Sequence, residues 1–76
     1  MNNADFLTEL NEVLQSETPL TNDLLLENIE EWDSMSALGV MSLFDMEFGM
    51  LVNADQLSAA KTIQDLIDLA GDNVIN

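Results

Sequence analysis

Residues 33–49 read Asp-Ser-Met-Ser-Ala-Leu-Gly-Val-Met-Ser-Leu-Phe-Asp-Met-Glu-Phe-Gly, and this stretch decides the fold of the chain. A polar pair comes first, apolar residues follow at helical spacing, and a glycine comes last. Glycine readily adopts the left-handed conformation that stops many helices. The stretch therefore predicts a helix from Ser34 to Phe48 that stops at Gly49.

The two sides of this predicted helix differ when its residues are placed at 100° per residue. The side expected to face a core carries Ala37, Val40, Met41, Phe44 and Phe48. The opposite side carries Met35, Gly39, Ser42 and Met46, with Leu38 on its flank. Because methionine adapts to surfaces of different shape, this outer side suits transient docking of a partner. Surplus apolar surface is the alternative, since single exposed apolar residues are normal.

Gly39 is the unusual residue of that outer side. Glycine inside a helix costs about 1 kcal/mol relative to alanine. Close approach of a partner backbone would explain why glycine stands there. We then expect Gly39→Ala to stabilise the isolated protein and to slow the action of a partner enzyme on it.

The rest of the chain also favours helices. Asn2 or Asn3 can cap a first helix, whose apolar face comprises Phe6, Leu7, Leu10, Val13 and Leu14. A long loop from Ser16 to Asp33 follows, with apolar anchors at Leu20, Leu24, Leu25, Leu26 and Ile29. We expect a short helix near Ala54 to Ala59. Thr62 and Asp65 form a capping-box pattern that opens a last helix before Gly71.

These patterns predict an all-α fold in one domain over residues 1–76, a small bundle of three main helices plus one short helix. The net charge is −14, because 15 carboxylates face a single basic residue, Lys61. Nucleic acid and anionic membranes should be repelled, whereas basic protein surfaces should be attracted. No apolar stretch approaches the ~20 residues of a membrane span, and no signal pattern is visible. We expect a cytoplasmic monomer without membrane insertion.

Metal chemistry is not predicted. The chain contains neither cysteine nor histidine, the usual zinc ligands. Aligning Asp45 and Glu47 with a calcium loop puts Met50 at the glycine position and Gln56 at the final acidic position. Both positions fail, so calcium binding by such a loop is not expected.

Ser34 is the candidate functional residue. Without an imidazole to activate it, the hydroxyl is no triad nucleophile, and we expect no catalytic residue in the chain. A serine can still be modified by another enzyme. Asp33-Ser34-Met35 in a small acidic helical protein resembles the Asp-Ser-Leu motif of acyl carrier proteins. The resemblance covers nearly the whole chain and is closest from Glu30 to Leu69.

This resemblance implies a cofactor, partners and a role. A phosphopantetheinyl transferase would attach 4′-phosphopantetheine from coenzyme A to Ser34, flanked by Asp33 and Met35. The arm would hold acyl groups as thioesters for loading, transferring or condensing enzymes with basic docking surfaces. The pathway would be fatty-acid or specialised biosynthesis, polyketide-like or surface-modifying. Housekeeping carriers usually have glutamates where this chain has Gly39 and Met46, so a specialised member is favoured.

The resemblance also implies two further sets of residues. Partner docking is expected at Met35, Leu38, Gly39, Ser42 and Met46, with Glu30 and Glu31. A pocket for the acyl group is expected among Val40, Phe44, Val52, Leu57, Ala60, Ile63 and Leu66, each of which is also a plausible core residue.

Other interpretations remain open at this point. The cargo could be aminoacyl or peptidyl, or the chain could be an unmodified acidic helical interaction domain. Ser34 could simply cap its helix. An acidic cluster upstream, Asp23, Glu27, Glu30, Glu31 and Asp33, is either a patch that steers a basic partner or a solvated loop. Trp32 is expected to pack against the loop and the core.

Overall fold

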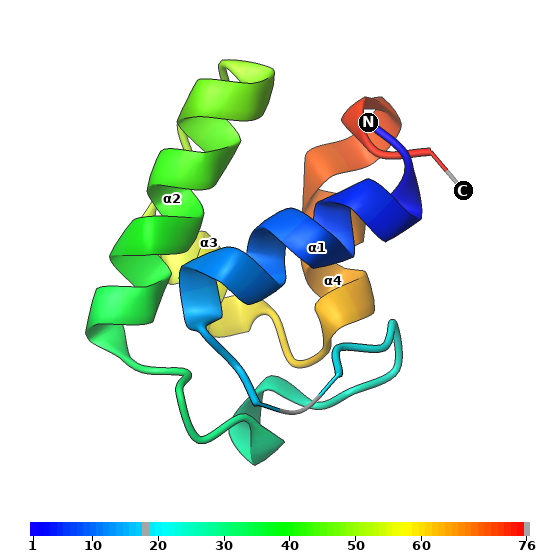
Figure 1. The fold of residues 1–76 in the computed structure, drawn as a ribbon. Helices are drawn as coiled ribbons and strands as arrows, with labels where there is room; N and C mark the ends of the chain where they lie inside the picture. The colour runs from blue at the N-terminus through cyan, green and yellow to red at the C-terminus, as the bar shows by residue number, and fades with distance from the viewer. Residues whose placement is uncertain (18, 76) are drawn as a thin grey trace.

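The described residues of the protein, a computed structural model, form four α-helices (Figure 1). The structure describes residues 1–17 and 19–75. The helices are α1 (Asn3–Leu14), α2 (Ser34–Phe48), α3 (Ala54–Ala59) and α4 (Ile63–Ala70). Two short 3-10 turns lie at Leu26–Asn28 and Gly71–Asn73, and the described residues contain no strand. The predicted all-α architecture of three main helices and one short helix is confirmed.

Polar side chains start each helix. Asn2 caps α1, Asp33 caps α2, and Asn53 caps α3 in a capping box with Gln56. Thr62 and Asp65 form the predicted capping box of α4. Each cap satisfies a backbone N–H that the first helical turn leaves unpaired. Gly49, with a φ of 63°, ends α2 as predicted.

Three phenylalanines join α1 to α2 at the centre of the core. The rings of Phe6 and Phe44 meet edge to face, with centroids 5.9 Å apart. Phe48 stacks on Phe6 at 6.1 Å and meets Phe44 edge to face at 5.5 Å. Such pairs contribute about 0.5–1.5 kcal/mol each beyond the burial of their area. This cluster fixes how α1 crosses α2 (Figure 1).

The contacted side of α2 is wider than the sequence predicts. Val40 and Phe44 are fully buried, and Ala37, Met41 and Phe48 pack against the core as expected. Leu43 is buried as well, although the helical wheel did not place it there. The wheel assumes a single direction for the core, whereas α2 contacts both α1 and α3.

The outward position predicted for Gly39 is wrong. A Cβ atom built on Gly39 would lie 2.7 Å from Val13 Cγ1 of α1, far inside the normal contact distance. The glycine therefore lets α1 approach α2 within the molecule. Its place in the sequence is explained by helix packing, and no partner backbone is needed to account for it.

The loop between α1 and α2 is held in place by side-chain amides. Asn22 donates to Asn3 Oδ1 (3.1 Å) and to Gln64 Oε1 (2.9 Å), and it accepts a hydrogen bond from Asn3 Nδ2 (3.0 Å). Leu26 N–H donates to the Lys61 carbonyl, which ties the loop to the α3–α4 connection. Among the expected apolar anchors, Leu20, Leu26 and Ile29 are buried, Leu24 is partly buried, and Leu25 is exposed. These contacts hold the loop, and with it Trp32 and Asp33, in a defined position before the start of α2.

Candidate functional site

Ser34 is the first residue of α2, and Asp33 caps the helix in its place. Oδ1 of Asp33 accepts hydrogen bonds from Ser36 N–H (2.9 Å) and from Ser36 Oγ (3.1 Å). The hydroxyl of Ser34 is exposed and has no hydrogen-bond partner among residues 1–17 and 19–75. The capping role considered for Ser34 thus belongs to its neighbour Asp33, and the Ser34 hydroxyl is not used to cap the helix.

Asp33 is held as a carboxylate beside this hydroxyl. The hydrogen bond from the Ser36 backbone N–H lowers the pKa of Asp33 below its ordinary value, and the Ser36 hydroxyl lowers it further. The carbonyl oxygen of Glu31 is a second acceptor of the Ser36 hydroxyl, whose single proton it shares with Asp33 Oδ1. These bonds hold the turn that precedes Ser34 and cap the start of α2.

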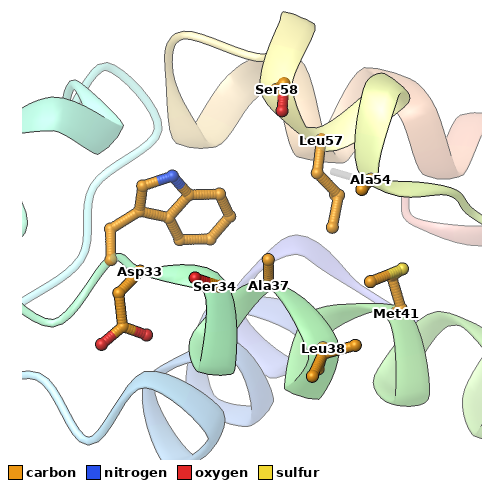
Figure 2. Close-up of a pocket in the computed structure, with 9 residues that line it drawn as sticks. Asp33, Ser34, Ala37, Leu38, Met41, Ala54, Leu57 and Ser58 are labelled. Atoms are coloured by element: carbon orange, nitrogen blue, oxygen red, sulfur yellow. The ribbon is translucent and has the colours of Figure 1, made fainter.

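A cavity of about 450 Å³ opens beside Ser34, between the start of α2 and α3 (Figure 2). It is lined by Trp32, Asp33, Ser34, Ala37, Leu38, Met41, Ala54, Leu57 and Ser58. Ala37 and Met41 point from α2 toward Leu57 of α3, while the carboxylate of Asp33 points away from the cavity (Figure 2). Below, this space is called the first cavity. Its walls are mainly apolar, and its rim carries the reactive candidate Ser34.

The first cavity does not have the predicted lining. Of the seven residues expected to form an acyl pocket, Leu57 alone belongs to it. Val40, Phe44, Ile63 and Leu66 are fully buried in the core, and Val52 is buried too. Ala60 is partly buried and borders other hollows of the surface. The expected residues fill the interior instead, and the open space lies nearer to Trp32.

Sequence reasoning missed most of this lining. Trp32 packs against the core as expected, but it also forms a wall of the first cavity. Ala54 and Ser58 come from a short helix whose orientation no local pattern predicts. The one usable signal was the bulky Trp32 two residues before Ser34, which had to lie near that serine in any fold.

The outer side of α2 carries the remaining predicted docking residues. Met35, Leu38 and Met46 are 80%, 63% and 81% exposed, and Ser42 is exposed between them. We call Met35, Leu38, Ser42 and Met46 the exposed strip of α2. Gly39 is excluded from the strip because it contacts α1.

The acidic cluster lies in the loop that leads to α2. Asp23, Glu27, Glu30 and Asp33 are exposed, and Glu31 is partly buried. No group of three or more potential ligands that could hold a metal ion occurs in the described part of the chain. No described helix is both long enough and apolar enough to cross a membrane.

Comparisons with known proteins add no relative to this picture. No family model, no curated protein and no solved structure matches the chain.

Proposed function

We propose that this chain is an acyl carrier protein, modified on Ser34 with 4′-phosphopantetheine. The observation that carries the proposal is the Ser34 hydroxyl, which is exposed and unbonded at the first residue of α2. The Asp-Ser-Met motif that resembles the family's attachment motif occupies this helix start. The chain itself carries out no chemistry on the cargo.

The surroundings of Ser34 fit the group chemically. A phosphodiester on Oγ would lie at the N-terminal end of a 15-residue helix, where the helix dipole favours negative charge. The adjacent first cavity offers apolar walls to whatever extends from the serine. When attached, 4′-phosphopantetheine supplies the thiol that a chain without cysteine lacks, and this thiol carries acyl groups as thioesters.

The chain has a limited part in the attachment of 4′-phosphopantetheine. Ser34 Oγ forms a bond to the phosphorus that bears pantetheine in coenzyme A, while the pyrophosphate bond breaks and 3′,5′-ADP leaves. The hydroxyl proton passes to a base of the transferase or to water. Asp33 fixes the start of α2 through Ser36, so that Oγ faces outward.

The exposed strip and the acidic cluster support transient docking to enzymes with basic surfaces. Apolar side chains at the strip can fill a pocket, and the net charge of −14 accelerates encounter with a cationic partner. Met46 stands where housekeeping carriers usually have an acidic residue, which favours a specialised biosynthetic pathway. Carriage of aminoacyl groups and an unmodified interaction domain are the competing outcomes of the test.

The test is modification in vitro. The purified protein is incubated with coenzyme A and a broad-specificity phosphopantetheinyl transferase, and its intact mass is measured. We expect one phosphopantetheine adduct on the wild type and none on Ser34→Ala. Thr8→Ala, which removes an exposed hydroxyl of α1 outside the exposed strip, should be modified like the wild type. A folded wild-type protein that gains no adduct would refute the proposal and leave an interaction domain.

A further inference from the structure

Trp32 borders two cavities at once. Besides the first cavity, it lines a second cavity of about 460 Å³, formed with Leu25, Leu26, Glu27, Ser58, Ala60 and Lys61. Trp32 and Ser58 are the two residues that both cavities share. Ser58 has a small side chain, so the indole is the bulky group of the shared wall.

Apart from the shared wall, the two cavities are lined by different parts of the protein. Asp33 and side chains of α2 and α3 form the rest of the first cavity, whereas the second lies against the loop before α2 and the α3–α4 connection. The indole is half-buried, and its N–H makes no hydrogen bond to the described residues. Replacing the Trp32 side chain therefore changes the wall between the two cavities without removing a side-chain hydrogen bond.

Side chains of the protein itself fill the hydrophobic core. Val40 and Phe44 are fully buried in the core, and Leu57, which lines the first cavity, is only 2% exposed. Phe44 also packs edge to face against both other phenylalanines. An apolar group that extends from Ser34 has the first cavity beside it, and the indole of Trp32, two residues before the serine, forms one wall of that cavity.

We propose that Trp32 is the specificity-determining residue for the cargo, and that its indole limits what the first cavity covers to a short or flat acyl group. This inference rests on the proposed attachment to Ser34. Longer chains would need the second cavity, from which the indole separates them. Replacing Trp32 with a small residue joins the two cavities and extends the covered length toward Lys61.

The length of acyl chain that the protein covers can be measured by how strongly the thioester is protected from cleavage. The protein is loaded by the transferase with straight acyl groups of increasing length and with a benzoyl group, and cleavage by hydroxylamine is followed by mass spectrometry. Each further buried CH₂ should slow cleavage up to about fourfold, because burial of one CH₂ corresponds to that factor in an equilibrium. In the wild type the protection should level off at a short chain. In Trp32→Ala it should continue to longer chains, with Trp32→Phe between the two.

A control and a second signal keep the inference testable. Leu51→Ala removes a side chain that is 90% exposed and lines neither cavity, so its length profile should match the wild type. Trp32 is the single tryptophan and the chain has no tyrosine, so its fluorescence reports on this wall alone. Loading a short acyl group should shift the emission to shorter wavelength and reduce quenching by acrylamide.

The outcomes separate this inference from the proposed function. If the wild type and Trp32→Ala are both loaded but show superimposable length profiles, Trp32 does not select the cargo. If Trp32→Ala does not fold, the wild-type fluorescence decides, and an emission spectrum unchanged by loading overturns the inference. If Ser34 accepts no adduct in the wild type, the carrier function itself fails and this inference fails with it.

Discussion

Gly39→Ala tests whether α1 and α2 meet as the structure has them. Alanine gains about 1 kcal/mol over glycine in a helix interior. Its Cβ, however, would lie 2.7 Å from Val13 Cγ1. Valine in a helix has one strongly preferred rotamer and cannot easily turn away, so the helices must separate. Overpacking of this kind costs about 1–3 kcal/mol. The balance predicts a net destabilisation of about 1 kcal/mol, the reverse of what helix propensity alone predicts.

The assay is thermal and urea unfolding followed by circular dichroism. A loss of about 1 kcal/mol lowers the Tm of a domain of this size by about 4–8 °C. In a Val13→Ala background the obstructing methyl is absent, so the same Gly39→Ala change should stabilise the protein by about 1 kcal/mol. This reversal of sign is the decisive feature. If Gly39→Ala raises the Tm equally in both backgrounds, the close approach of α1 is refuted and Gly39 becomes available to a partner.

Three further perturbations test the loop and the charges. Asn22→Ala removes the side-chain amide that joins Asn3 to Gln64, and it should destabilise the protein by about 1–3 kcal/mol. Hydrogen exchange of the Leu26 backbone N–H should become faster. Unchanged exchange at Leu26 would show that other contacts hold the loop. The pKa of Asp33 is lowered in the folded state, so its contribution to stability is complete above its unfolded pKa of roughly 4 and is lost as the pH falls through the lower folded value. Asp33→Asn, which keeps the cap without the charge, should therefore flatten the loss of stability in acid unfolding curves recorded below pH 4, and a curve identical to the wild type contradicts the assignment. Association with a loading enzyme should weaken steeply with ionic strength, whereas a flat salt profile would make the acidic cluster merely solubilising.

The helix ends were predictable because their signals are local. Thr62 and Asp65 satisfy each other's backbone within one turn, and Gly49 ends α2 through its own backbone freedom. Such features depend on neighbours in sequence, so they can be read without knowing the fold. The predicted ranges of α2 and α3 accordingly match the structure.

The surroundings of the site depend on packing between distant segments. Whether Gly39 faces a partner or α1 depends on the crossing of two helices, which periodicity within one helix cannot specify. The lining of the first cavity likewise combines Trp32 from the loop with Leu57 from α3. The sequence predicted the exposure of Met35, Leu38 and Met46 on α2 and made Ser34 the candidate, but it did not predict the cavity that Ser34 borders.

The central claim is that Ser34 carries a covalent arm in the cell. The most direct measurement is peptide mass mapping of the protein purified from its source cells. The account predicts that the peptide containing Ser34 bears 4′-phosphopantetheine, with or without an acyl group. A native protein whose Ser34 is entirely unmodified would contradict it.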